Sequence, residues 1–144
     1  MSKAEDAAQT FGKGFNCSQG VLSAFSDELG MDAALAYRVA SAFGGGMARM
    51  GGTCGAVTGA FMVIGLKHGM TAETAWKSND MVYAKVMEFA DKFKARYGSI
   101  TCRDLLGYDI SNRETLLEVR KKGLFQTICP EMVKSAAEIV ESLI

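Results

Sequence analysis

Four cysteines carry the most distinctive chemistry of this 144-residue chain, and each stands at the start of a predicted helix. They are Cys17, Cys54, Cys102 and Cys129. Free backbone N–H groups and the helix dipole at such a position stabilise a thiolate relative to a thiol. We therefore expect all four to be candidates for thiols with a lowered pKa and enhanced reactivity or metal affinity.

The cysteines are separated by 37, 48 and 27 residues along the chain. These separations match neither the paired spacing of a zinc ribbon nor a local ferredoxin run, so a shared site must be assembled by tertiary folding. A single free cysteine is often a small buried hydrophobic residue. Four at equivalent helix starts, with none elsewhere, favour a chemical role over a purely structural one.

All periodic segments of the chain predict helices, and none alternates with period two for long enough to predict a strand. The expected helices begin at Asn16, Asp32, Thr53, Thr71, Thr101 and Ser111, and the last one has Pro130 at its first helical position. The expected fold is all-α, an irregular bundle of about six or seven helices, two or three of them short. We expect one domain over residues 1–144.

Two of these helices have clear apolar stripes. The stripe of the second is Leu35, Val39, Ala42 and Phe43. The longest helix, from Thr71, carries Ala75, Val82, Val86, Phe89, Phe93 and Tyr97 on one face and lysines such as Lys77 elsewhere.

Glycines surround Cys54. Gly52 and Gly55 leave room for another backbone, a sulfur atom, a metal or a substrate, and Gly59 lies on the same helix face as Gly55. Gly59 and Gly65 both lie within the predicted helix, where glycine favours close packing against a second helix over ligand contact, and both interpretations remain open. We expect Cys54 to be the central thiol.

The segment from Cys54 to Gly59 reads Cys-Gly-Ala-Val-Thr-Gly and has one cysteine upstream and two downstream. This pattern resembles the C_GCAxxG_C_C family of redox-active proteins, chains of about this length with four characteristic cysteines and a Cys-Gly-Ala-x-x-Gly motif. The resemblance covers essentially the whole chain. It implies a redox-active, cysteine-dependent protein in which the four cysteines are the functional residues.

Two chemistries fit four such cysteines. In thiol–disulfide exchange, one thiolate attacks a disulfide and a second cysteine resolves the product, as in a cysteine-dependent oxidoreductase. In a metal site, four thiolates hold an iron–sulfur cluster or zinc. The chain has no Cys-x-x-Cys on a βαβ unit, which argues against a thioredoxin-like protein but leaves a pair formed across helices open. We favour redox-active thiols, with metal binding as the alternative.

A third hypothesis concerns the loop Gly44–Gly52, which reads GGGMARMGG and offers several N–H groups and Arg49 to a small molecule or anion. It lacks the lysine of a P-loop and a dinucleotide fingerprint, so a plain helix connection is the simpler interpretation. If Arg49 acts, we expect it to stabilise the Cys54 thiolate or hold an acidic group of a substrate. Gly55, Gly59 and Arg49 are thus candidate cofactor-binding residues.

Composition excludes several classes of function. Sixteen basic residues balance sixteen acidic ones, which disfavours nucleic-acid binding. The longest apolar run, residues 54–66, is too short for a membrane span, and no signal peptide is evident, so we expect a cytoplasmic protein without membrane insertion. Its partner is then a redox protein or a small-molecule substrate. The same small-residue helix suits a homodimer interface as well as an internal core.

Overall fold

The computed structural model describes residues 1–76 and 79–144, and within them the chain forms α-helices and short 3-10 helices but no strand. The all-α prediction is therefore confirmed. The α-helices are α1 (Lys3–Gly12), α2 (Cys17–Ser26), α3 (Ala33–Ala40), α4 (Gly55–His68), α5 (Asp80–Tyr97), α6 (Cys102–Leu106), α7 (Arg113–Lys121), α8 (Leu124–Thr127) and α9 (Cys129–Leu143). The sequence predicted seven helix starts, and the two α-helices that it did not predict are α1 and the one-turn α8.

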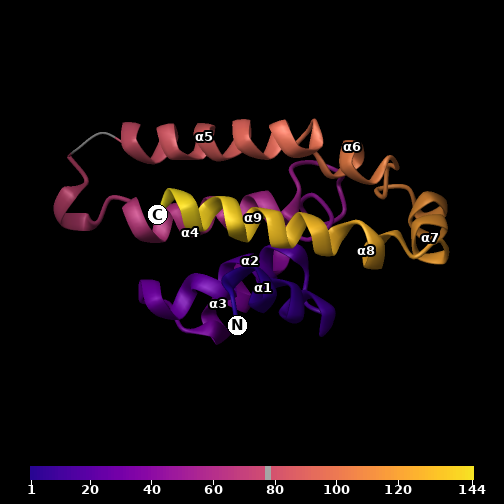
Figure 1. The fold of residues 1–144 in the computed structure, drawn as a ribbon, viewed down its shortest axis with the longest axis horizontal. Coiled ribbons are helices and arrows are strands. Elements are labelled where there is room, and N and C mark those ends of the chain that lie inside the picture. The colour runs from indigo at the N-terminus through magenta and orange to yellow at the C-terminus, as the bar shows by residue number, and fades with distance from the viewer. Residues whose placement is uncertain (77–78) are drawn as a thin grey trace.

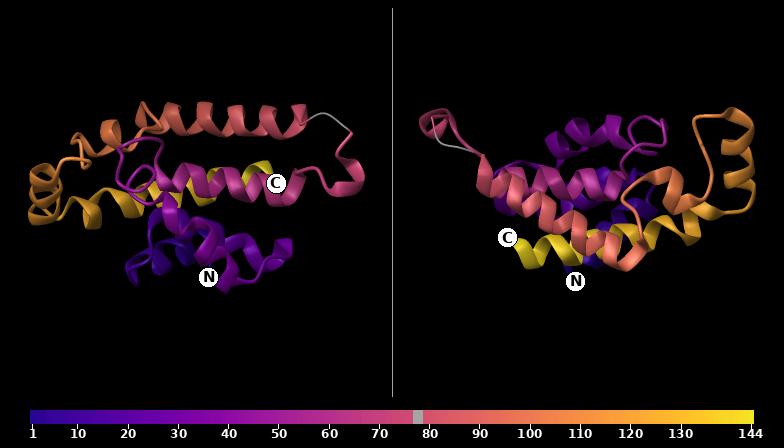
Figure 2. Two further views of the ribbon diagram at one scale, coloured as in Figure 1. Left: turned by 180° about the vertical axis from the view of Figure 1, so that it is seen from behind. Right: turned by 90° about the horizontal axis from the view of Figure 1, so that it is seen from above.

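The helices form three layers. Figure 1 shows α5 on one side, α4 and α9 in the middle, and α1, α2 and α3 on the other side. The short helices α6, α7 and α8 lie together at one end, beside the loop that precedes α4 (Figure 2). This end of the bundle is where the starts of α4, α6 and α9 come together.

The main core lies between the layers and is filled by aliphatic and aromatic side chains of α2, α4, α5 and α9. Phe89 and Phe93, both fully buried on α5, stack with their ring centroids 5.9 Å apart. Phe61 of α4 meets Phe89 edge-on at 5.8 Å. A second, smaller cluster at the end of the bundle contains Cys102, Leu106, Ile110, Leu116 and Val119.

The α2–α4 contact is unusually close because α4 has glycines on the side that faces α2. A Cβ atom at Gly59 would lie 2.8 Å from the carbonyl oxygen of Ser18, and one at Gly55 would lie 3.2 Å from the Cβ of Cys17. Gly65, in contrast, has open space at its Cβ position. The expected close packing therefore holds for Gly55 and Gly59 but is wrong for Gly65.

Some helix starts differ from the prediction by one residue. The residue that caps α4 is Cys54 and not Thr53, because the backbone of Thr53 pairs with Thr101 in an isolated antiparallel bridge. The cap of α7 is Asn112 and not Ser111, since the Asn112 side chain accepts hydrogen bonds from two backbone N–H groups of the first turn.

The longest helix begins at Asp80, whereas the sequence predicted a start at Thr71. Thr71 instead caps a single 3-10 turn, Ala72–Thr74, whose threonine side chains bond to each other and to the backbone. Such local bonds compete with an α-helix. The predicted position of Lys77 lies outside the described residues.

The apolar stripe predicted for α3 does not face the core. Leu35 and Val39 are each more than two-fifths exposed, while Ala36 and Ala40 are fully buried against the rest of the protein. Since α3 packs closely on α2 through alanines, its larger side chains are left at the surface. None of the helices in the described part of the chain is both long and apolar enough to cross a bilayer.

Candidate functional site

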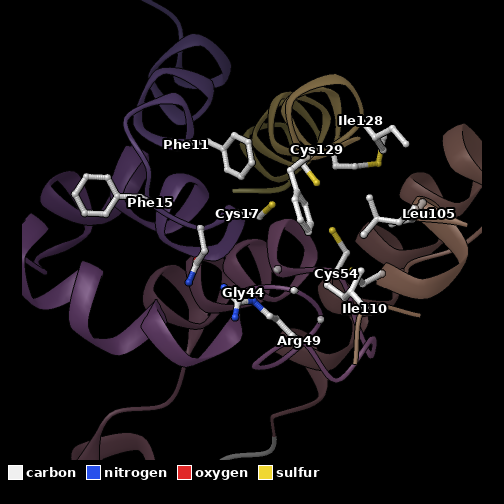
Figure 3. Close-up of a pocket in the computed structure, with 18 of the residues that line it drawn as sticks. Phe11, Phe15, Cys17, Gly44, Arg49, Cys54, Leu105, Ile110, Ile128 and Cys129 are labelled. Atoms are coloured by element: carbon white, nitrogen blue, oxygen red, sulfur yellow. The ribbon is translucent and has the colours of Figure 1, made fainter. Parts of the chain in front are cut away.

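All four cysteines line one cavity of about 520 Å³ at the end of the bundle where the helix starts meet. Figure 3 shows the side chains of Cys17, Cys54 and Cys129 converging on its centre from different elements. All four are free thiols, and only Cys129 is more than marginally accessible. Tertiary folding thus brings together four thiols, although each cysteine is 27 to 48 residues from the next one along the chain.

Cys17 is held by an N-terminal capping box. The side chain of Asn16 accepts a hydrogen bond from the Gln19 backbone N–H at 2.9 Å, and the Gln19 side chain accepts one from the Asn16 N–H at 2.8 Å. The Asn16 amide group also donates to the backbone oxygen of Ser41. These bonds fix the first turn of α2 against the start of the 3-10 helix that follows α3, Ser41–Phe43, and they orient Cys17 into the cavity.

Cys54 and Cys102 are positioned by the bridge between Thr53 and Thr101. The Cys54 backbone N–H donates to the carbonyl oxygen of Ile100, and the Cys102 backbone N–H donates to that of Gly52, both with an N···O distance of 2.7 Å. Side chains alternate between the faces of such a pairing, so Cys54 and Cys102 share the face opposite the two threonines. They are diagonal neighbours, which in an antiparallel pair are about 7–8 Å apart.

Cys129 lies at the junction of α8 and α9, directly before Pro130. The two helices are nearly continuous, because Ile128 between them has αR backbone angles. Ile128 and Cys129 pack against both hydrophobic clusters. Cys129 therefore lies where the main core and the end cluster meet, with its thiol in the cavity between them.

Burial raises the pKa of Cys54 and Cys102, contrary to the expectation that helix starts would lower the pKa of all four thiols. The pKa of Cys54 rises to about 11, although the backbone N–H groups of Ala56 and Val57 favour its thiolate. Burial and the neighbouring thiols raise the pKa of Cys102 to about 12. Loss of water around the sulfur outweighs the helix N-terminus because a buried thiolate is poorly solvated.

Cys17 and Cys129 form the exception, since their thiols interact directly. Hydrogen bonding to Cys129, followed by burial, raises the pKa of Cys17 well above its usual value. The same bond lowers the pKa of Cys129, against the effect of its burial. The arrangement is that of a Cys17 thiol donating to a Cys129 thiolate. Cys129, rather than the expected Cys54, is the thiol that most readily ionises.

The loop Gly44–Gly52 forms a further wall of the cavity. Gly45, Gly46 and the three residues that follow, Met47, Ala48 and Arg49, all have positive φ angles, between 53° and 68°. A non-glycine residue pays about 1–2 kcal/mol for this left-handed conformation, and consecutive ones are rare. Such strain persists where the surrounding structure enforces it, often at functional sites.

The candidate residues other than cysteine are only partly brought together. Gly55 and Arg49 line the cavity, whereas Gly59 packs against Ser18 at the α2–α4 contact and does not line it. Gly46, within the loop singled out from the sequence, also lines the cavity, and Arg120 is a lining residue that the sequence analysis missed. Gly46 has no space for a side chain, because a Cβ there would lie 2.7 Å from the Cβ of Cys102. Arg120 comes from α7, and nothing in its local sequence distinguishes it from other surface arginines.

The four sulfur donors are chemically suited to zinc or an iron–sulfur cluster. Within residues 1–76 and 79–144, however, no group of three or more Cys, His, Asp or Glu side chains is arranged so that it could hold a metal ion. Metal binding also needs thiolates, and the pKa values of Cys17, Cys54 and Cys102 are raised. The described arrangement does not fit a four-thiolate metal site.

Comparison with protein families gives one match, which covers residues 15–143. Its description is "Putative redox-active protein (C_GCAxxG_C_C)". The label places Gly before Cys in its motif, whereas this chain has Cys54 before Gly55. Neither a curated protein nor a solved structure matches the chain. Because the matched segment includes all four cysteines and nearly the whole chain, the protein belongs to the C_GCAxxG_C_C family of redox-active proteins.

Proposed function

We propose that this protein is a thiol–disulfide oxidoreductase in which Cys129 is the attacking thiol and Cys17 the resolving thiol. The observation that carries the proposal is the direct interaction of these two thiols, which lowers the pKa of Cys129 and raises that of Cys17. The thiolate is the nucleophile in thiol–disulfide exchange. A hydrogen-bond donor beside it is also the group best placed to attack in the second step.

The reaction needs no co-reactant other than the substrate disulfide. The Cys129 thiolate attacks one sulfur, the substrate S–S bond breaks, and the first half leaves as a thiolate that takes up a proton. Cys17 then loses its proton and attacks the Cys129 sulfur, which releases the second substrate half. The substrate gains two electrons and two protons, and the protein is left with a Cys17–Cys129 disulfide. Two equivalents of an external thiol then reduce the Cys17–Cys129 disulfide by the same kind of exchange, and they leave as their own disulfide to complete the cycle.

Cys54 and Cys102 are the matched controls for this assignment. Both line the same cavity, but their pKa values of about 11 and about 12 keep them as thiols at neutral pH. Diagonal neighbours of an antiparallel pair are in general about 7–8 Å apart, which exceeds the Cα separation of about 4.4–6.8 Å that a disulfide requires, so we do not expect these two cysteines to pair with each other.

The test is to react the reduced protein with a chromogenic aromatic disulfide and compare four single cysteine-to-serine variants. Cys129→Ser should lose the fast reaction at neutral pH. Cys17→Ser should release one aryl thiol and retain the other as a stable mixed disulfide on Cys129, detectable by mass. Cys54→Ser and Cys102→Ser should release two aryl thiols per chain, as the unmodified protein does.

A fast reaction that survives in Cys129→Ser but is lost in Cys54→Ser would overturn the assignment and restore Cys54 as the central thiol. Circular dichroism of each variant shows whether a lost reaction reflects lost chemistry or lost folding. Because Cys102→Ser changes a buried thiol of the same cavity, it controls for the general effect of placing a hydroxyl there.

A further inference from the structure

The wall of the cysteine cavity is positively charged. Among the described residues that line it, the permanently charged side chains are Arg49 and Arg120, and none is an aspartate or glutamate. Neither arginine forms a salt bridge with any residue in the described part of the chain. Arg49 lies at the edge of the cavity beside Gly44 (Figure 3). Two unpaired guanidinium groups beside a thiol site favour an anionic ligand.

The left-handed loop adds backbone donors to this wall. Its backbone hydrogen bonds use the N–H groups of Met47 and of residues 49–52, which donate to the carbonyl groups of preceding residues. Within residues 1–76 and 79–144, the N–H groups of Gly45 and Gly46 have no acceptor, and both glycines line the cavity. Successive backbone N–H groups without partners strengthen the attraction of a concave surface for an anion.

The rest of the lining is largely apolar. Phe11, Leu105, Ile110 and Phe125 lie around the thiols and suit a short hydrocarbon chain. A cavity of about 520 Å³ is the size of a small-molecule site. It does not accommodate a folded protein partner.

We infer that the substrate of the thiol pair is a small disulfide with anionic, carboxylate-bearing ends, which Arg49 and Arg120 bind while its sulfur atoms face Cys129. This inference rests on the proposed function, because it names the substrate for the same two thiols. One carboxylate pairs with a guanidinium group and the glycine N–H groups. The methylene groups contact the apolar wall, and the S–S bond is left near the thiolate.

The experiment compares three disulfides that share one skeleton and differ only in end-group charge: 3,3′-dithiodipropionate, bis(2-hydroxyethyl) disulfide and cystamine. Each rate with the reduced protein is divided by the rate of the same disulfide with 2-mercaptoethanol, which removes differences in intrinsic reactivity. At low ionic strength, the normalised rate should be at least tenfold higher for the dicarboxylate than for the neutral compound, and lowest for cystamine. The preference should decrease as salt is added.

Arginine variants connect the preference to the cavity. Arg49→Gln and Arg120→Gln should each reduce the preference several-fold, while Arg49→Lys should retain most of it. Arg113→Gln is the matched control, because Arg113 lies on α7 with Arg120 but does not line the cavity. A preference that is equally reduced in Arg113→Gln would indicate the overall charge of the protein and overturn the inference.

A second measurement is independent of the chemistry. Octanedioate, in which two methylene groups replace the sulfur atoms of dithiodipropionate, should bind to the reduced protein in a calorimetric titration and bind more weakly to Arg49→Gln and Arg120→Gln. Equal normalised rates for the three disulfides, with closure of Cys17–Cys129 retained, would overturn the inference and leave the proposed function standing. If none of them oxidises Cys17 and Cys129, the proposed function fails, and absent octanedioate binding then rejects the anionic ligand as well.

Discussion

At the scale of single residues, the protonation of the four cysteines is determined by their surroundings and not by their shared position at helix starts. Cys54 has two helix N–H groups close to it, yet its pKa rises to about 11 because it is buried. Cys129 is at the least distinct helix start, because α8 runs almost directly into α9 and leaves few free backbone N–H groups there. Its pKa is nevertheless lowered. The difference comes from Cys17, whose thiol supplies a hydrogen bond across 112 positions of sequence.

The sequence alone identified the set of four cysteines but could not rank them. Their positions beside capping residues are local features that a single sequence shows. The hydrogen bond between Cys17 and Cys129 depends on how α2 and α9 pack, and burial depends on the whole core. Neither can be derived from the residues around one cysteine.

Replacing Cys17 with alanine should raise the pKa of Cys129. The Cys17 thiol stabilises the Cys129 thiolate, so its removal leaves burial as the remaining influence, which favours the neutral thiol. The pH profile of alkylation of Cys129 by iodoacetamide, followed by mass spectrometry of its peptide, should shift to higher pH. Cys102→Ala is the control and should shift the profile little. An unchanged profile in Cys17→Ala would contradict the assigned hydrogen bond.

At the scale of elements, the site depends on close approaches that glycines permit and on a single bridge between two loops. Gly55 and Gly59 bring α4 against the start of α2, and this contact places Cys17 next to the N-terminus of α4. The Thr53–Thr101 bridge brings Cys54 and Cys102 near each other in a similar way. Sequence periodicity predicted most of the helices, but a one-residue bridge has no periodic pattern. The pairing of the two loops could therefore not be predicted.

Two glycines of α4 allow a matched test of the helix contact. In Gly59→Ala, the new Cβ would lie 2.8 Å from the Ser18 carbonyl oxygen, so the free energy of unfolding should decrease by about 1–3 kcal/mol, the usual cost of overpacking. In Gly65→Ala, the Cβ has open space, and the gain in helix propensity should increase the free energy of unfolding by about 0.5–1 kcal/mol. Urea unfolding measures both. Equal effects of the two substitutions would argue against a close α2–α4 contact.

At the scale of the whole molecule, the cavity lies where the main core meets the smaller cluster around α6 and α7. The bundle therefore excludes water from the thiols while leaving Cys129 partly accessible. The sequence predicted an all-α fold with every segment from α2 onward except α8. It did not predict the second cluster, because burial of Ile110 and Val119 depends on how α6 and α7 fold back against α8 and α9.

Burial of neutral thiols makes stability depend on alkaline pH. In the unfolded chain, thiols titrate near about 8.5. The folded protein holds the protons of Cys54 and Cys102 up to about 11 and about 12. Between these values the unfolded state binds fewer protons than the folded state, so the free energy of unfolding should fall as pH rises. Cys129, with its lowered pKa, contributes in the opposite direction only below the unfolded value, where the unfolded state binds its proton and the folded state releases it.

The measurement is urea unfolding of the fully reduced protein from neutral pH to about pH 10.5, a range that spans the titration of the unfolded thiols. Cys54→Ala should show a shallower fall than the unmodified protein, because it lacks one of the raised thiols. The same slope in both proteins would mean that Cys54 is not kept neutral by burial.

The central claim is that Cys17 and Cys129 form the redox pair, and identifying the disulfide of the oxidised protein tests it most directly. The reduced protein is treated with one equivalent of a neutral small disulfide, the remaining thiols are blocked, and the unreduced digest is mapped by mass spectrometry. The account predicts one linked pair of peptides that contains Cys17 and Cys129, with Cys54 and Cys102 blocked as free thiols. A disulfide that includes Cys54 or Cys102, or the absence of any disulfide, would contradict it.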